Sequence, residues 1–340
     1  MKVPFSKSEA RAWARENMHG VANVMTPTFT SDLSALNEKA TRHDIRLEIE
    51  YGFCGTLMVS EVAVTLDEYA EFVASGADEA QGQLQLIHHA SFNSLEDNIA
   101  VAQLTQTRGA SLALLGYPPT FYPKSADDIY VYTKAFCDAT DLGVILFPVP
   151  LWGFERIHPS AGFGPELIDR LLKTCPNIVA IKAEGGMPTV GGFVDVYNRF
   201  ADQVIVIEPI EGNGLPLATL LDLQFMGTSN YEYFGPTIPR IFKLIREGKK
   251  NEAMDEYWKI FPGRQASVAA MAVLAGSNFL HRMLWKYQGW LQGFNGGPLR
   301  APSMRLVDRQ MKLLRQGLIS SGYELDGLGD AEFFVGRNLA

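Results

Sequence analysis

The feature that most constrains the fold is a regular alternation of short apolar runs with longer amphipathic stretches. Eight apolar runs of five to seven residues recur between Gly20 and Ser229. Most are almost continuously apolar, as expected for strands that are buried on both faces. They lie at 20–25, 55–59, 84–89, 111–115, 143–149, 177–182, 203–208 and 224–229.

An amphipathic stretch of helical length follows each run. Thr65 with Glu68 three residues later is the capping-box pattern of a helix start, and Gly109 is typical of a helix end. Eight strand–helix units in single file predict a (β/α)8 TIM barrel. A doubly wound open sheet is the alternative, but it needs a glycine-rich phosphate loop after an early strand, and the sequence shows none. The predicted helices are 36–51, 66–80, 94–108, 125–139, 164–174, 191–200, 215–223 and 237–247.

The alternation stops after Gly248. Stretches 250–275, 278–293 and 303–320 predict helices with no strand between them, and residues 322–340 predict a loosely packed tail. We therefore divide the chain into a barrel, residues 15–248, and a C-terminal helical appendage with its tail, residues 249–340.

Composition excludes several classes of function. The formal charge of −8 and the lack of any Lys/Arg cluster argue against nucleic acid as a partner. The three cysteines are scattered and form no CxxC, so we expect neither a disulfide framework nor a structural zinc site. No apolar run approaches transmembrane length, and no signal peptide is recognisable. These features predict a cytoplasmic protein without a membrane partner.

Lys182 is the outstanding candidate for chemistry. The active site of such a barrel lies at the carboxyl ends of its strands, and Lys182 ends the apolar run Asn-Ile-Val-Ala-Ile-Lys. Burial lowers the pKa of an ammonium group, and the free amine can attack a ketone to form a Schiff base. The alternative is a lysine that reaches out of the barrel mouth or pairs with Glu184.

Two adjacent histidines end the third predicted strand. His88 and His89 face opposite ways on a strand, so at most one points into the barrel. A strand dipeptide does not converge on one ion and no HExxH is present, so we expect no metal site. One of the two is a candidate for hydrogen bonding or acid–base work.

The run that ends in Lys182 also carries a resemblance. Asn177–Lys182 is similar to the segment around the Schiff-base lysine of the dihydrodipicolinate synthase / N-acetylneuraminate lyase family of class I aldolases. Thr26-Pro27, Pro118-Pro119, Phe147–Pro150 and Gly296–Pro302 add weaker matches. The resemblance implies the barrel fold, an imine-forming Lys182, no cofactor and a homo-oligomer, usually a tetramer.

The departures from that family are informative. The family's proton-shuttling tyrosine falls on Phe147, which has no hydroxyl group. The Gly-Thr-Thr-Gly-Glu loop that binds the substrate carboxylate is reduced to Val59–Val62. The arginine that lysine-biosynthesis members use for the acceptor falls on Trp152. These changes imply retained Schiff-base chemistry with altered proton transfer and acceptor recognition. The proton relay is left to His88, Tyr122, Glu61, Tyr231 or an ordered water.

The sequence therefore predicts a Schiff-base lyase of the aldolase or hydratase-aldolase type. Its substrate would be a small 2-oxo acid such as pyruvate, with a hydrophobic, aromatic acceptor half because Trp152 offers a flat apolar face. The alternative is a degenerate barrel that binds or senses a ketoacid. The predicted site comprises catalytic Lys182, Phe147, His88 and Tyr122 and substrate-binding Thr26, Ser60, Glu61, Trp152, Phe121, Asn230 and Tyr231.

Overall fold

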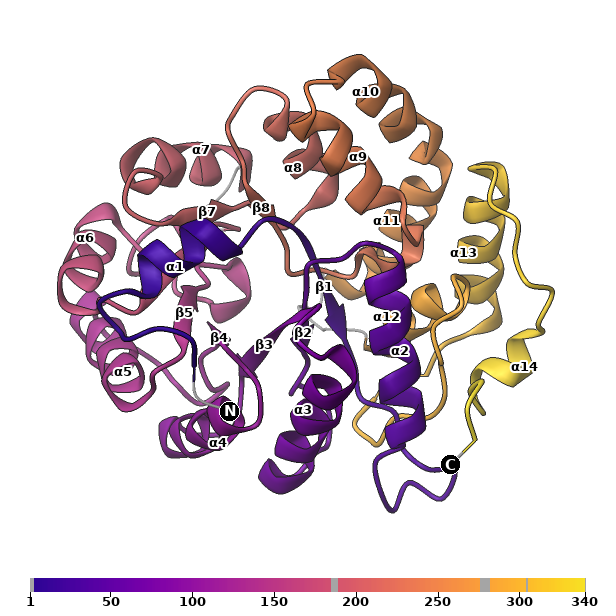
Figure 1. Ribbon diagram of the computed structural model, residues 1–340, viewed down its shortest axis with the longest axis horizontal. Coiled ribbons are helices and arrows are strands. Elements are labelled where there is room, and N and C mark those ends of the chain that lie inside the picture. The colour runs from indigo at the N-terminus through magenta and orange to yellow at the C-terminus, as the bar shows by residue number, and fades with distance from the viewer. Residues whose placement is uncertain (1–2, 185–188, 276–281, 304, 340) are drawn as a thin grey trace.

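A computed structural model describes residues 3–184, 189–275, 282–303 and 305–339. Within these residues, eight parallel strands pair in the order β7-β6-β5-β4-β3-β2-β1-β8. Strands β7 and β8, at the two ends of that order, contact each other, so the sheet curls into a barrel (Figure 1). The strands are β1 (Gly20–Met25), β2 (Gly55–Met58), β3 (Gln85–Ala90), β4 (Leu112–Leu115), β5 (Gly143–Leu146), β6 (Ile178–Lys182), β7 (Ile205–Ile207) and β8 (Phe225–Met226).

Helices follow the strands and surround the barrel (Figure 1). The capping box predicted at the start of α3 is present: the Thr65 hydroxyl accepts from the Glu68 amide, and the Glu68 carboxylate accepts from the Thr65 amide. The eight paired strands and the helices that follow them confirm the predicted (β/α)8 barrel. The helices are α2 (Glu38–Glu50), α3 (Leu66–Ala80), α4 (Leu95–Thr107), α5 (Ala126–Ala139), α6 (Pro165–Thr174), α7 (Thr189–Phe200), α8 (Glu211–Ala218) and α9 (Thr237–Arg246).

Helix α8 differs from the prediction for a local reason. It begins at Glu211, four residues before the predicted start at residue 215, and Pro216 therefore lies inside the helix. Proline has no N–H to donate to the carbonyl four residues earlier, which is that of Gly212. The hydroxyl of Tyr257 donates to this carbonyl instead, at 2.8 Å. A tertiary contact therefore allows a helix that the local sequence disfavours.

Apolar side chains form two separate cores. One lies between the strands and the surrounding helices. The other fills the barrel, where Val24, Leu57, Leu114 and Ile207 meet. A helix that the sequence did not suggest, α1 (Ala10–Asn17), packs its Ala10 and Ala14 against this inner core. Because this core fills the interior of the barrel, two of the cavities, with volumes of about 340 and 740 Å³, lie at the carboxyl ends of the strands and among the loops that follow them.

The C-terminal region is helical, as predicted, but the bounds of its helices differ from the prediction. Stretch 250–275 forms two helices, α10 (Lys250–Lys259) and α11 (Phe261–Ala275), because Pro262 begins a new helix. The predicted helix 278–293 corresponds to α12 (Arg282–Trp290), and its first four residues lie outside the described part of the chain. Helix α13 (Asp308–Ser320) packs against α11.

The prediction of a loose C-terminal tail is wrong. Phe333, in α14 (Asp330–Phe333), is fully buried. The Arg337 guanidinium donates to the Trp290 carbonyl, and the Asn338 amide donates to the Asn295 side chain at 2.8 Å. These contacts tie the tail to the end of α12.

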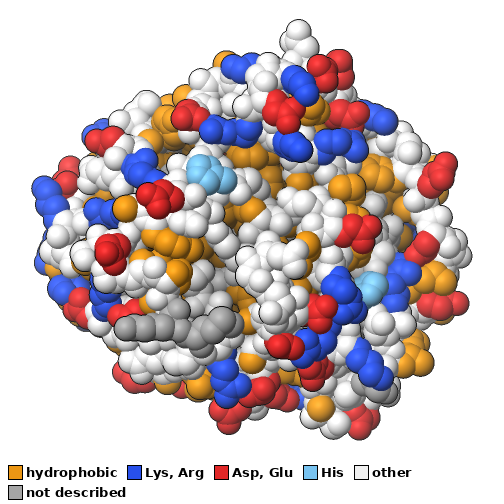
Figure 2. Space-filling model, in the orientation of Figure 1, with side chains coloured by type: hydrophobic (Ala, Val, Ile, Leu, Met, Phe, Trp, Pro, Cys, Tyr) orange, Lys and Arg blue, Asp and Glu red, His pale blue; other side chains and the backbone are white. Residues whose placement is uncertain are grey.

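Charged side chains of both signs are interspersed over the face of the molecule shown in Figure 2. Among the described helices, none is both long and apolar enough to span a bilayer.

Candidate active site

Lys182 ends β6 and points into the barrel. It lies beside Ile207 of β7, whose side chain belongs to the inner core. The side chain of Lys182 is almost fully buried, and its Nζ donates to the carbonyl oxygen of Thr228 at 2.8 Å. The ring of Phe147 lies against the same nitrogen, 3.9 Å from Nζ to the ring centroid. The position that carries a tyrosine in the resembled family thus holds an apolar ring against the amine.

The environment of Lys182 favours the free amine. Burial lowers its pKa from 10.5 to about 8, although the carboxylates of Glu184 and Glu208 act in the opposite direction. A pKa near 8 leaves roughly a tenth of the side chain unprotonated at pH 7. A nucleophilic amine is therefore available near neutral pH.

Lys182 opens onto a cavity of about 340 Å³, which we call the lysine cavity. Its wall is mainly apolar, with polar groups concentrated near the amine. No group of three or more His, Cys, Asp or Glu that could hold a metal ion is found among the described residues. The lining residues are Val24, Leu57, Glu61, His89, Leu114, Phe147, Val149, Pro150, Leu151, Lys182, Glu184, Thr228, Ser229, Met271, Arg282 and Trp285.

Two carboxyl groups lie near the amine. Glu184 Oε2 is 3.9 Å from Lys182 Nζ, and burial raises the pKa of Glu184 while the lysine charge lowers it. Burial also raises the pKa of Glu208, to about 7. One Glu208 oxygen accepts from the Ile210 amide at 2.9 Å, and Glu208 does not line the cavity. Glu184 is therefore the carboxyl group placed to exchange protons with a molecule bound at Lys182.

His89, rather than His88, points into the barrel. Its Nδ1 accepts from the Ser60 amide at 3.3 Å, and its Nε2 lies 3.9 Å from Glu61 Oε1. Burial, with a smaller effect of the Lys182 charge, lowers the pKa of His89 to about 3, so the ring is neutral. With Nδ1 accepting, the ring proton lies on Nε2 and faces the Glu61 carboxylate.

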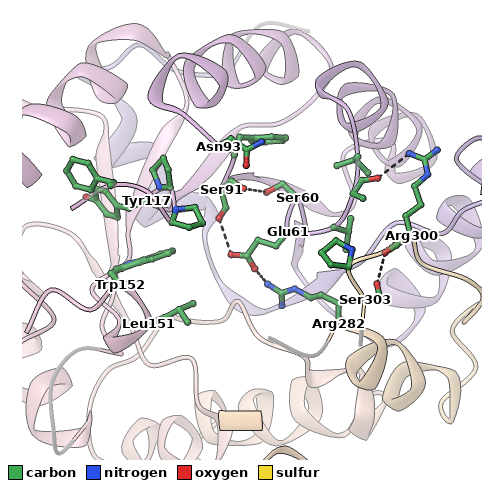
Figure 3. Close-up of a pocket in the computed structure, with 18 of the residues that line it drawn as sticks. Ser60, Glu61, Ser91, Asn93, Tyr117, Leu151, Trp152, Arg282, Arg300 and Ser303 are labelled. Atoms are coloured by element: carbon green, nitrogen blue, oxygen red, sulfur yellow. Dashed lines mark hydrogen bonds and ion pairs between the residues drawn. The ribbon is translucent and has the colours of Figure 1, made fainter. Parts of the chain in front are cut away.

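A second, larger cavity of about 740 Å³ adjoins the first; we call it the outer cavity (Figure 3). The Tyr117 ring stacks on Phe121 and meets the edge of Trp152, with 5.5 Å and 5.8 Å between ring centroids. Trp152 is held by a 2.7 Å hydrogen bond from Nε1 to the Phe147 carbonyl. The lining residues are Ser60, Glu61, Val62, Ala63, Val64, Ser91, Phe92, Asn93, Tyr117, Pro118, Pro119, Phe121, Leu151, Trp152, Phe154, Arg282, Arg300, Pro302 and Ser303.

An ion pair stands where the two cavities meet. Arg282 of α12 and Glu61 of the loop after β2 line both cavities and pair with each other (Figure 3). Glu61 also accepts from the Ser91 hydroxyl at 3.0 Å. The barrel thus contributes the negative group of this pair, Glu61, and the C-terminal region contributes the positive group, Arg282.

The structure brings together six of the eleven predicted site residues. Three of these line the lysine cavity, and four line the outer cavity, with Glu61 common to both. The lysine cavity contains Lys182, Phe147 and Glu61, and the outer cavity contains Ser60, Glu61, Phe121 and Trp152.

The other five lie elsewhere. His88 faces outward, where its Nδ1 pairs with the Thr105 hydroxyl of α4 at 3.1 Å, because the inward place belongs to His89. Tyr122 is 73% exposed, with the Arg156 guanidinium over its ring. Thr26, Asn230 and Tyr231 line neither cavity: Asn230 donates to Gln288, and the Tyr231 hydroxyl donates to the Pro209 carbonyl.

Three titratable residues of the lysine cavity, His89, Glu184 and Arg282, were missing from the predicted site. Strand alternation could have identified Glu184, because a residue two positions after Lys182 returns to the same side. Arg282 had no such signal, since it lies in a helix far along the chain from the barrel strands.

Comparisons with known proteins identify the family of this chain. The model of the dihydrodipicolinate synthetase family matches residues 17–274. A 4-hydroxy-tetrahydrodipicolinate synthase of Chloroherpeton thalassium is 26% identical over 212 residues, which cover 61% of this chain and 66% of that protein, just under two thirds of its length.

Solved structures show the same fold. The dihydrodipicolinate synthase of Aquifex aeolicus superposes with a TM-score of 0.75 at 16% identity, covering 91% of this chain and 100% of that one. The N-acetylneuraminate lyase of Fusobacterium nucleatum gives a TM-score of 0.69 at 17% identity, covering 88% and 97%. The family match covers most of the chain and includes the strand that ends in the buried lysine, so this chain belongs to the dihydrodipicolinate synthetase family, a family of lyases of the class I aldolase type.

Proposed function

We propose that the protein is a Schiff-base lyase that acts on a 2-oxo acid through Lys182. The observation that carries this proposal is the buried amine, with its pKa lowered to about 8, at the wall of a 340 Å³ cavity. A lysine that served only the fold would gain from charge and a carboxylate partner at bonding distance. Lys182 instead contacts a carbonyl oxygen and an aromatic ring.

The chemistry follows from the amine. Its lone pair attacks the ketone carbon, and the carbonyl oxygen takes up two protons and leaves as water, which forms a protonated imine. The imine accepts the electron pair of a neighbouring C–C or C–H bond, giving an enamine. Loss of the hydroxyl proton then releases an aldehyde in the aldol direction, whereas loss of hydroxide completes a dehydration. In the aldol direction the remaining enamine takes up a proton to become an imine again, whereas loss of hydroxide gives an unsaturated imine directly. Hydrolysis of either imine releases the 2-oxo acid and restores Lys182.

The acceptor half of the substrate is expected to occupy the outer cavity. Tyr117, Phe121 and Trp152 present ring faces and edges there, which favour an apolar, aromatic group. Trp152 stands where lysine-biosynthesis members of the family use an arginine, so a charged aldehyde finds no guanidinium at that position.

Reductive trapping tests the proposed imine. Incubation with pyruvate and sodium borohydride should add the mass of the reduced adduct to the peptide that contains Lys182, as read by mass spectrometry. The exposed Lys173 of the same chain serves as the control peptide. A panel of ketones that leaves Lys182 unmodified would contradict the imine. An adduct without any turnover would favour the ketoacid-binding alternative.

Trp152→Ala tests the aromatic acceptor. Loss of the indole face should raise KM for aromatic 2-oxo substrates about 10- to 100-fold, with less effect on short aliphatic ones, because the apolar area lost is worth roughly 1.5–3 kcal/mol. Trp258→Ala, at an exposed tryptophan of α10, is the matched control. Unchanged kinetics of the Trp152 variant on every aromatic substrate would contradict the proposal, as would a wild-type preference for small charged aldehydes.

A further inference from the structure

Four of the six backbone amides of residues 59–64, in the loop after β2, are already engaged within the protein. The amides of Val59 and Ser60 are already used, the first by the Met25 carbonyl and the second by His89 Nδ1. The amides of Val62 and Val64 donate within the loop itself. This leaves few loop amides for the carboxylate of a 2-oxo acid bound at Lys182, so a charged side chain in the lysine cavity is the stronger partner.

Arg282 is a suitable partner by position. Among the described residues that line the lysine cavity, Lys182 and Arg282 are the two with cationic side chains. Lys182 is consumed in the imine, so its nitrogen cannot also clamp the carboxylate. Arg282 reaches the cavity from α12, and only 8% of its surface is exposed. The Trp285 ring lies 4.3 Å from its guanidinium carbon and steadies it.

Arg282 also has unused hydrogen-bonding capacity. A guanidinium group carries five N–H donors arranged along its edges. One terminal nitrogen pairs with Glu61, while the buried Nε has no hydrogen-bond partner among the described residues. A buried donor without a partner costs free energy that a bound anion can recover. The Nε edge is thus available for a second carboxylate beside Glu61.

We infer that Arg282 holds the carboxylate of the ketone that forms the imine with Lys182. Two negative groups, the substrate carboxylate and Glu61, would then lie beside two positive groups, Arg282 and the protonated imine, so the charges balance. The role that the resembled family gives to a loop of the barrel passes to a helix of the C-terminal region. This inference rests on the proposed Schiff-base function and names the substrate class as 2-oxo acids rather than neutral ketones.

Paired probes test the inference. Pyruvate and pyruvamide have the same shape, but pyruvamide lacks the charge. The readout is the ketone concentration that gives half-maximal borohydride adduct at Lys182. Wild type should favour pyruvate about 10- to 100-fold, as expected for a charge-assisted contact. Arg282→Gln should abolish that preference, and Arg282→Lys should keep part of it. Thermal melting confirms that each variant is folded.

Two further variants separate the effect of Arg282 on the pyruvate preference from that of the Glu61 charge and from a general loss of an ion pair. Arg282→Gln leaves the Glu61 charge behind, which could repel pyruvate by itself. The double variant Arg282→Gln/Glu61→Gln removes both charges and should still show no preference. Arg264→Gln breaks an ion pair with Glu211 that lines neither cavity, and it should keep the wild-type preference.

The outcomes separate the two proposals. If neither ketone labels Lys182 in the wild type, the imine itself is wrong, and the role of Arg282 falls with it. If both ketones label Lys182 with equal half-saturation in the wild type, the imine stands and the assignment of Arg282 is wrong. A pyruvate preference that survives in Arg282→Gln, or that returns in the double variant, also overturns the assignment.

Discussion

Lys182→Met is expected to abolish turnover and to make the folded protein more stable. Without the amine no imine forms, and loss of a covalent catalyst should lower kcat by at least about 10⁴-fold. Methionine fills a similar volume in the apolar end of β6. The measurement is turnover of the best 2-oxo acid substrate together with chemical denaturation of both proteins.

The stability gain has a defined pH dependence. Lys182 has a pKa of about 8 in the folded protein, against an ordinary value of 10.5. The folded state therefore disfavours the charged lysine, and this cost is fully present below pH 8. Between about pH 8 and 10.5 the folded protein has lost the proton that the unfolded chain still binds, so wild-type stability rises with pH.

Methionine removes that cost. We expect Lys182→Met to be more stable by about 1–3 kcal/mol at pH 7, after allowing for the lost hydrogen bond to the Thr228 carbonyl. The difference should shrink between pH 8 and 10.5. A variant that is less stable than wild type at pH 7 would show that Lys182 serves the fold, and residual turnover above a hundredth of wild type would contradict its catalytic role.

The barrel could be predicted because each of its strands carries a local signal. Apolar runs bounded by turns gave the strand order, and the predicted start of β1 at Gly20 and both ends of α3 agree with the structure. Helix α8 was misplaced because the contact that accommodates Pro216 comes from Tyr257, in another helix. Local sequence does not contain such tertiary compensation.

The residues of the candidate site also fall into those that a local signal could predict and those that depend on tertiary packing. Lys182 and Glu61 lie on strands or the loops after them, so barrel geometry places them without further information. The sequence shows that His88 and His89 face opposite sides of β3, but which of them faces the interior depends on how β3 pairs with its neighbours. Arg282 comes from the C-terminal region, whose docking onto the barrel mouth depends on tertiary packing.

The proton relay is where the structure changes the prediction most. Of the candidates drawn from the sequence, His88, Tyr122 and Tyr231 do not reach the lysine cavity. Glu61 reaches it, but its carboxylate is engaged by Arg282 and Ser91. Glu184 remains: it lines the lysine cavity, with its Oε2 3.9 Å from Lys182 Nζ. We propose Glu184 as the acid–base group that replaces the tyrosine.

Glu184→Gln should therefore lower kcat about 10²- to 10⁴-fold, the range expected for loss of general acid–base catalysis. The imine should still form, because removing a nearby carboxylate lowers the pKa of Lys182 further and favours the free amine. The borohydride adduct at Lys182 should persist while turnover is lost. The acidic limb of the pH profile of kcat should disappear, because kcat reports the complex in which the imine has formed and the Lys182 amine no longer titrates, so that limb reports the raised-pKa carboxyl of Glu184.

Glu208→Gln is the matched control, because Glu208 is also buried near Lys182 with a raised pKa but lines neither cavity. If Glu184 transfers protons by contact with the substrate, the Glu208 variant should keep the acidic limb and lose far less activity. If both variants lose activity equally, the carboxyl groups act only through their charge on Lys182. A Glu184→Gln enzyme with wild-type kcat would leave the relay to another polar group of the lysine cavity, such as Glu61 with the His89 ring that faces it, or the hydroxyl groups of Thr228 and Ser229.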